Sequence, residues 1–170
     1  MEQEKLRFKD KSTGIYNKDY FFETGGYLLT LATRSKVPLS ICVIDIDHLT
    51  RINERFGIKI GDEVLKTVAK TIESKCRRSD LLGYLGAGTI GLVLYDISGV
   101  NTGLVLNTLR KKIEHAIENP NHPKLKATVS IGACVMQGEI DKEKLEVVYN
   151  RAYLAVKNAK EAGRNKVVVF

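Results

Sequence analysis

The chain has 170 residues, of which 44% are hydrophobic and 28% charged, a composition typical of one globular domain with a full core. No hydrophobic run reaches the roughly 20 residues that span a bilayer, and no leader precedes the domain, so we expect a cytoplasmic protein without direct membrane insertion. The net charge of +7 favours an anionic partner. Because the basic residues are scattered rather than gathered in a stripe, we do not expect that partner to be a nucleic acid.

The spacing of hydrophobic residues predicts helices and strands that alternate along the chain. The first part of the chain begins with a charged lead-in or linker over 1–11, followed by an expected helix over 18–35 that is weakened by glycines at 25–26, a strand over 39–45 and a helix over 48–56. After a loop over 57–61 we expect a helix over 62–76 and two strands, over 81–85 and 91–95, around a turn at 86–90. The last part is expected to form a helix over 100–118, a strand over 127–136, a helix over 142–162 and a strand over 166–170. This order predicts an α+β domain over 12–170, with helices around a central, mostly antiparallel sheet.

The strand predicted over 39–45 leads into two carboxylates, Asp45 and Asp47. Carboxylates at the end of a buried strand can hold Mg²⁺ against the phosphates of a nucleotide. The same residues also fit a polar strand end or a helix N-cap, and for Asp47, which precedes a short helix, the cap is the favoured interpretation.

Several spaced segments together resemble the GGDEF family of diguanylate cyclases. The family's motifs appear as DKSTGIYN at 10–17, DIDHLTRINE at 45–54, FGIKIGDEVL at 56–65, TVSIG at 128–132 and AKEAGRN at 159–165. The resemblance covers the chain from about residue 10 to its end. It implies a nucleotidyl cyclase palm-like (ferredoxin-like) fold in which Asp45, Asn53, Asp62 and the turn at 86–90 border one cleft.

The turn that names the family departs from its pattern, since GGDEF is replaced by GAGTI at 86–90. Gly88 stands where the resemblance places a metal-binding acid, and Thr89 stands where it places a second acid. Thr50 and Ile58 also replace a phosphate-binding lysine and a histidine. Joining a 3′-hydroxyl to an α-phosphate needs neutralised phosphates and help in deprotonating the hydroxyl. We therefore expect no catalytic residues and no enzyme activity, with Asp45 left as a weak, vestigial metal ligand.

Other family positions are retained on the nucleotide face. Asn53 and Asp62 match the pair that reads guanine, and Lys160 and Arg164 match cations that contact phosphates. Asp62 also fits a helix N-cap, and the two cations also fit a helix C-terminus, where positive charge is favourable. The resemblance thus implies a vestigial GTP site that requires no cofactor and takes Mg²⁺ only together with GTP.

The segment Arg77-Arg78-Ser79-Asp80 contains an R-x-x-D pattern at the family's distance from the turn. The resemblance implies that Arg77 and Asp80 form the site at which these enzymes bind their product, cyclic di-GMP. Arginine can grip the acceptor edge of guanine, and a carboxylate can accept its N–H donors. Arg110 is the candidate for a further ligand-binding arginine. Without the resemblance, the pattern also fits an ordinary salt bridge at a helix end.

Two hypotheses follow from these residues. The leading one is a non-catalytic receptor for cyclic di-GMP, a bacterial second messenger, which relays the signal to a partner domain or protein and is linked into a dimer by the ligand. The alternative is an inactive GTP-sensing or protein-interaction domain that does not bind cyclic di-GMP. In either case we expect a cytoplasmic domain. The charged lead-in favours a fragment or a tethered domain, and one alternative is a tether to a membrane protein through a missing N-terminal region.

Overall fold

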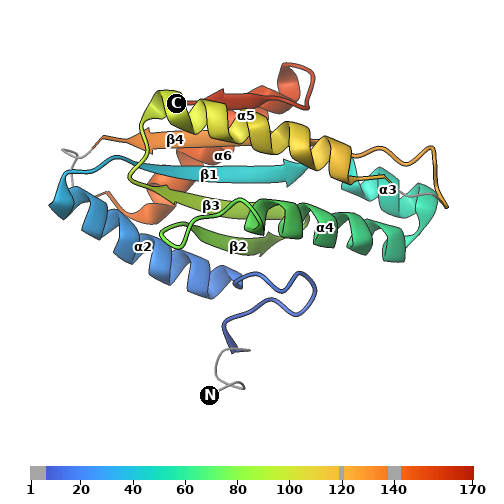
Figure 1. Ribbon diagram of the computed structural model, residues 1–170, viewed down its shortest axis with the longest axis horizontal. Helices are drawn as coiled ribbons and strands as arrows, with labels where there is room; N and C mark the ends of the chain where they lie inside the picture. Colours follow the sequence, from blue (N-terminus) through green and yellow to red (C-terminus); the bar gives the residue numbers. More distant parts are fainter. Residues whose placement is uncertain (1–6, 119–120, 138–142) are drawn as a thin grey trace.

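A five-stranded sheet forms the centre of the computed structural model, which describes residues 7–118, 121–137 and 143–170 (Figure 1). The strands are β1 (Leu39–Ile46), β2 (Leu81–Gly86), β3 (Thr89–Tyr95), β4 (Val129–Met136) and β5 (Val167–Val169). They lie in the order β2-β3-β1-β4-β5, and only the β4–β5 pair is parallel. The α+β fold with a mostly antiparallel sheet is therefore confirmed.

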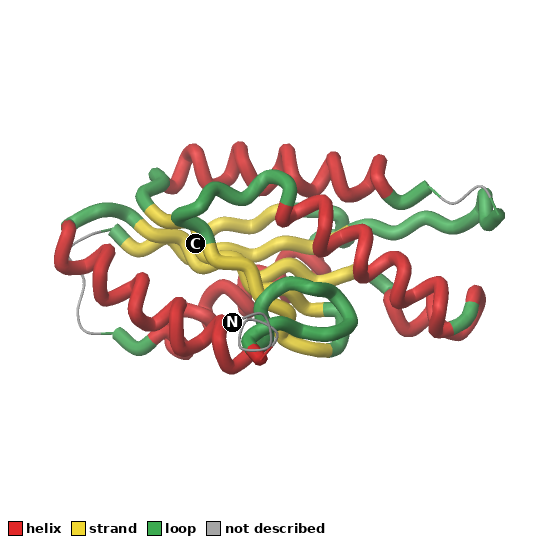
Figure 2. The backbone as a smooth tube through the Cα atoms, turned by 60° about the horizontal axis from the view of Figure 1, so that its bottom comes forward, coloured by secondary structure: helices red, strands yellow, loops and turns green. Residues whose placement is uncertain are grey.

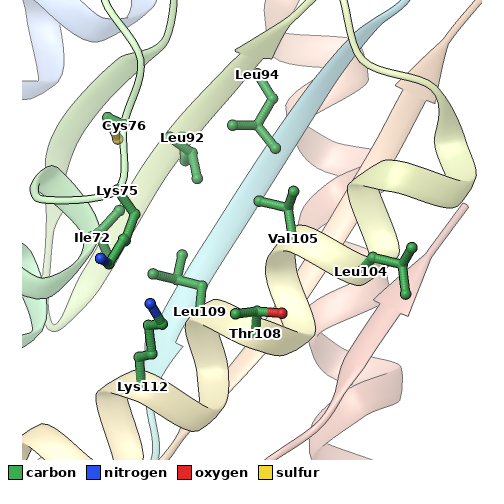
Figure 3. A pocket seen from close by; sticks show the side chains of 10 residues that line it. All are labelled: Ile72, Lys75, Cys76, Leu92, Leu94, Leu104, Val105, Thr108, Leu109 and Lys112. Atoms are coloured by element: carbon green, nitrogen blue, oxygen red, sulfur yellow. The ribbon is translucent and has the colours of Figure 1, made fainter.

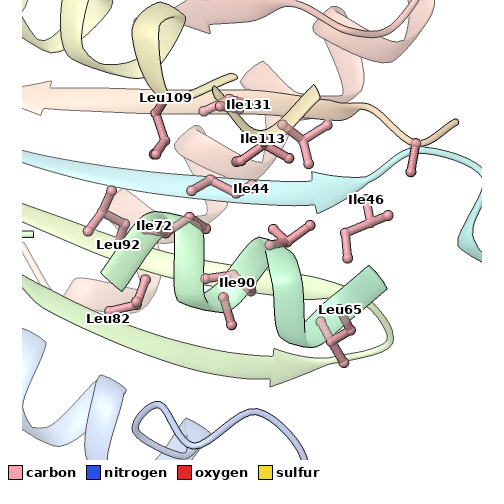
Figure 4. Close-up of a cluster of buried hydrophobic side chains, with 14 of the residues drawn as sticks. Ile44, Ile46, Leu65, Ile72, Leu82, Ile90, Leu92, Leu109, Ile113 and Ile131 are labelled. Carbon is pink, nitrogen blue, oxygen red and sulfur yellow. The ribbon is translucent and has the colours of Figure 1, made fainter. Parts of the chain in front are cut away.

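Helices cover both faces of this sheet (Figure 2). They are α2 (Lys18–Ser35), α3 (Leu49–Phe56), α4 (Ile58–Glu73), α5 (Gly99–Ala116) and α6 (Leu145–Glu161). Because successive side chains of a strand point to opposite faces, each strand contributes to two cores. Ile44 and Leu92 pack with α3, α4 and α5 on one face (Figure 4), whereas Val43 and Val93 pack with α2 and α6 on the other.

Glycines in the sheet let helices approach it closely. A Cβ at Gly91 would lie 2.5 Å from Cζ of the buried Phe21 in α2, and one at Gly83 would lie 2.7 Å from Cβ of the same residue. A Cβ at Gly132 in β4 would overlap the backbone of α6 at Ala152 and Val156. The absence of these side chains therefore sets the depth at which α2 and α6 pack.

The structure differs from the predicted elements in several places. The predicted loop at 57–61 is mostly helix, since α4 begins at Ile58 directly after Gly57, whose φ of 93° separates it from α3. The glycines at 25–26 do not interrupt α2. The turn between β2 and β3 is shorter than predicted, because β2 ends at Gly86 and β3 begins at Thr89. The last helix begins at Leu145. Its predicted start at 142 lies outside the described residues.

Part of the predicted lead-in packs on the domain. Backbone N–H of Asn17 donates to Phe8 O at 2.8 Å, and the Phe8 and Tyr20 rings lie 5.1 Å apart. The Asp10 carboxylate accepts hydrogen bonds from Ser12 and Thr13 in the turn before α2. These contacts join residues 7–11 to the fold.

None of the helices in the described part of the chain is long and apolar enough to cross a membrane.

We expect Gly132→Ala to destabilise the domain by about 3 kcal/mol, because the added methyl group meets backbone atoms of α6 that cannot rotate away. For a chain of this length, that change lowers Tm by about 6–12 °C. The matched control is Gly26→Ala in α2, where nothing lies within 4 Å of the added Cβ. We expect the control to hold or slightly raise Tm, and equal melting of the two variants would contradict the close packing of α6.

Candidate functional site

The end of β1 lies beside the β2–β3 turn, as the sequence predicts. Asp45 pairs with Thr89 across the strands, and Thr89 Oγ1 donates to Asp45 Oδ2 at 3.1 Å. The other carboxylate oxygen, Oδ1, lies 2.8 Å from Nζ of Lys160 at the end of α6. Only 13% of the Asp45 side chain is exposed. Both oxygens of the predicted metal ligand are therefore engaged by a cation and a hydroxyl of the chain itself.

The turn itself is held tightly against β1. Gly86, Ala87 and Gly88 have φ values of 97°, 51° and 76°. Gly88 O accepts the backbone N–H of Ile46 at 3.1 Å. A Cβ at Gly88 would lie 2.6 Å from Cδ2 of Leu49 in α3. An acidic side chain at this position would therefore have to displace Leu49 and adopt a backbone conformation that disfavours side chains.

The second carboxylate of the pair, Asp47, is buried with 3% exposure and has a structural role. It accepts hydrogen bonds from Thr128 Oγ1 at 2.7 Å, Ser130 Oγ at 2.7 Å and the backbone N–H of Asn165 at 3.1 Å. The favoured prediction of a helix N-cap is wrong, because His48 occupies the cap position of α3 and no side chain caps this helix. Asp47 instead ties β1 to β4 and to the segment that follows α6.

These residues do not fit a divalent metal ion. The two oxygens of Asp45 already contact Lys160 and Thr89, so a Mg²⁺ ion at Asp45 would have to displace these partners or share the oxygens with them. Across the described ranges, no group of three His, Cys, Asp or Glu side chains is arranged to hold a metal.

The predicted guanine-reading pair lies on neighbouring helices. Asn53 is one turn beyond Leu49 on α3, and Asp62 is an exposed residue of α4. Asp62 is not an N-cap, since α4 begins four residues earlier and its cap position is Gly57. The side-chain Oδ1 of Asn53 is buried and has no hydrogen-bond partner within the described structure. It lies over Gly61, where any Cβ would collide with it. The absence of a side chain at Gly61 thus makes room for this buried amide oxygen against α4.

The two predicted phosphate contacts have different surroundings. Lys160 is used by Asp45, whereas Arg164 is exposed in the turn after α6 with a φ of 63°. Its backbone N–H closes the helix by donating to Ala159 O at 3.0 Å.

Arg77 and Asp80 form a compact unit in the loop between α4 and β2. Arg77 Nη2 lies 3.2 Å from Asp80 Oδ1 and donates to the backbone oxygen of Tyr95 at 2.7 Å. The backbone N–H of Arg77 also donates to Asp80 Oδ2 at 2.7 Å. The Asp80 side chain is only 2% exposed, while that of Arg77 is 52% exposed. The carboxylate therefore fixes the loop and leaves one edge of the guanidinium facing solvent.

Arg110 does not join this unit within the chain, and its role as a further ligand-binding arginine stays a prediction. Its guanidinium donates to Asn165 Oδ1 at 2.6 Å and to Asn107 Oδ1 at 3.1 Å. Asn165 contacts Asp47 at the end of β1, whereas Arg77 contacts Tyr95, which pairs with the first residue of β1. The two arginines thus lie at opposite ends of the central strand.

Sequence reasoning missed the residues that support the site. Thr128 lies directly before β4, and Ser130 lies within it. The sequence signal that could have found them is the alternation of side chains along a strand, which places residues two apart on the same face, where both contact Asp47. Leu49 gave no signal, because its contact with the turn depends on how α3 packs.

Residues 7–166 match the family described as diguanylate cyclase, GGDEF domain. The chain is 34% identical over 166 residues to the probable diguanylate cyclase DgcT of Escherichia coli (strain K12) and 32% identical over 165 residues to the response regulator PleD of Caulobacter vibrioides. Each match covers 96% of this chain and 36% of the relative, so the chain spans about a third of their length.

A similar solved structure is the coiled coil and GGDEF domain of DgcB from Caulobacter crescentus in complex with c-di-GMP. It aligns with a TM-score of 0.91 at 20% identity and covers 99% of this chain and 88% of that one. At this identity the likeness shows a shared fold.

We expect Ser130→Ala to destabilise the domain by about 1.5–3 kcal/mol, because it removes a hydrogen bond from a carboxylate that is only 3% exposed. Ser79→Ala, at an exposed position of the α4–β2 loop, is the matched control and should change stability by less than about 0.5 kcal/mol. Chemical denaturation of both variants measures the difference. Equal stability would show that Asp47 does not depend on its β4 partners.

Proposed function

The chain belongs to the GGDEF domain family, and from that premise we propose that it is a non-catalytic receptor of cyclic di-GMP. The observation that carries the proposal is the Arg77–Asp80 unit, in which a buried carboxylate holds a half-exposed guanidinium at the surface. A guanidinium in this position presents a planar fork to the O6 and N7 acceptors of guanine. The complex of the DgcB GGDEF domain with c-di-GMP supports the choice of ligand.

The ligand would use both members of the unit. Guanine N–H donors are suited to the Asp80 carboxylate, which in the free chain is occupied by Arg77. An ion pair with one exposed partner is worth only about 0–1 kcal/mol. Exchanging it for charge-assisted hydrogen bonds to guanine is therefore favourable, and the backbone N–H of Arg77 can keep Asp80 in place during the exchange.

Loss of catalysis is supported by the surroundings of Asp45. Neither Gly88 nor Thr89 carries a carboxylate, and Lys160 and Thr89 bind the oxygens of Asp45 that would face a metal. Thr50 supplies no amine for a phosphate. The proposed domain therefore needs no metal of its own, and Mg²⁺ would enter only as a companion of GTP. Its output would be a change in contact with a partner domain or protein, or a dimer linked by stacked ligands.

One observation favours a second candidate function, GTP sensing on the vestigial face. The buried, unpartnered Asn53 Oδ1 could accept a hydrogen bond from guanine, and Asp62 is exposed on the adjoining helix. Arg164 is an exposed cation close in sequence to Lys160. This face lies at the end of β1 that carries Asp45, away from Arg77, so the two nucleotides would not compete.

Isothermal titration should show saturable binding of cyclic di-GMP with micromolar or tighter affinity. Arg77→Ala and Asp80→Ala should each weaken it roughly ten- to a hundredfold, as expected when a charge-assisted contact is lost. Arg78→Ala is the matched control, since Arg78 is exposed in the same loop and has the same charge. Added GTP should leave the affinity unchanged. Absence of heat with cyclic di-GMP, together with GTP binding that Asn53→Ala abolishes, would instead select the second candidate.

The purified chain should form no cyclic di-GMP from GTP with Mg²⁺ or Mn²⁺, and chromatography of the products measures this directly. Gly88→Asp combined with Thr89→Glu should not restore a fast cyclase, because Leu49 and a φ of 76° oppose the aspartate and Thr50 still lacks an amine. Melting curves show whether the variant remains folded. Turnover near one per second, a typical enzymatic rate of roughly that order, would refute the proposed loss of catalysis.

A further inference from the structure

A cavity of about 290 Å³ lies between α4, α5 and the sheet (Figure 3). Its wall is mainly apolar and includes Ile72, Leu92, Leu94, Val105 and Leu109. The cavity is close to the lower size limit of small-molecule sites in proteins, which is about 300 Å³. A water molecule takes up about 30 Å³ in the liquid, so the cavity has the volume of roughly ten water molecules. A small apolar body therefore fits between the two helices.

Two lysines converge at one end of this cavity. Lys75 follows α4 and Lys112 belongs to α5, and Figure 3 shows their side chains approaching each other. The hydrogen bond and positive charge of Lys75 lower the pKa of Lys112, so the two amines are close enough to interact. Neither lysine forms an ion pair with an acidic side chain in the described part of the chain. In the described residues, these two like charges thus meet without an acidic side chain at ion-pair distance.

The rest of the lining adds no negative charge. The remaining polar side chains in the wall are Thr108 and Cys76. Burial, followed by the negative charges of Asp80 and Glu73, which lie near the cavity but do not line it, raises the pKa of the Cys76 thiol to about 12, so the thiol stays neutral at physiological pH. The rim is apolar as well, with Leu104 63% exposed. The cavity therefore combines an apolar interior and an apolar rim with two cationic side chains at one end.

We propose that this cavity binds a small amphipathic anion, a carboxylate with an apolar body of about ten carbons. The body lies between α4 and α5, where it removes exposed leucine and valine surface from water. The carboxylate lies between Lys75 and Lys112, where it supplies the missing counter-charge and relieves their repulsion. This site adjoins the Arg77–Asp80 unit, since Lys75 and Cys76 directly precede Arg77 in the same loop, but it does not depend on the proposed binding of cyclic di-GMP.

Titration of the whole chain with decanoate below its micelle concentration tests the proposal, with decanol as the uncharged ligand of the same length. Decanoate should bind saturably, at least about tenfold more tightly than decanol, since decanol lacks the charge-assisted contacts. Chemical shifts of leucine and valine methyl groups should change at Leu92, Leu94 and Val105. Lys75→Gln and Lys112→Gln should each weaken decanoate binding about three- to fivefold and leave decanol unaffected.

The matched control is Lys111→Gln, which removes the same charge from the residue next to Lys112 but does not line this cavity. It should leave decanoate binding unchanged, and all three lysine variants should melt as the parent chain does because their side chains are exposed. Three results would each overturn the proposal: no saturable decanoate binding, equal binding of decanol, or equal loss in the Lys111 variant. Methyl shifts confined to another part of the domain would also overturn it.

Discussion

Asp47 is buried at the end of β1, and its carboxylate accepts hydrogen bonds from Thr128, from Ser130 and from the backbone after α6. A buried carboxylate is costly unless its oxygens are bonded, so these partners must assemble together. They join β1, β4 and the segment that leads into β5 at one point. The position of Asn165 follows from this junction, and with it the contact that draws Arg110 to the same end of the sheet.

The neighbouring Asp45 is held by contacts from the chain itself. The ammonium of Lys160 supplies positive charge and the hydroxyl of Thr89 supplies a donor, so both oxygens of Asp45 are satisfied. Lys160 reaches Asp45 because α6 packs directly on the sheet, and this packing depends on the missing side chain of Gly132. The contacts of Asp45 thus bring together residues of the β2–β3 turn and of the end of α6, which are distant in the chain.

The loop between α4 and β2 joins two positively charged features. On one side, Arg77 is held by Asp80 and by the end of β3. On the other side, Lys75 and Cys76 line the cavity beneath α5. Arg77 pairs with Asp80, and no acidic side chain of the described residues forms an ion pair with Lys75 or Lys112, so positive charge is in excess on this part of the surface.

Local features of the molecule were decided by the sequence alone. Hydrophobic spacing gave the order of helices and strands, and the motifs gave the family and placed Asp45 beside the β2–β3 turn. The pairing of Arg77 with Asp80 was also readable, since residues three apart at a helix end can meet. Such properties depend on neighbours within a few positions, which is the range that periodicity and motif spacing describe.

Other properties were decided only by the tertiary structure. Asp47 bonds to residues more than 80 positions away, Leu49 fills the space above Gly88, and Arg110 lies at the far end of β1 from Arg77. Asp62 lies inside a helix whose start the sequence placed too late. Each of these depends on how elements distant in the chain pack against one sheet, and that packing is set by the combined volumes and polar contacts of many side chains rather than by any local pattern.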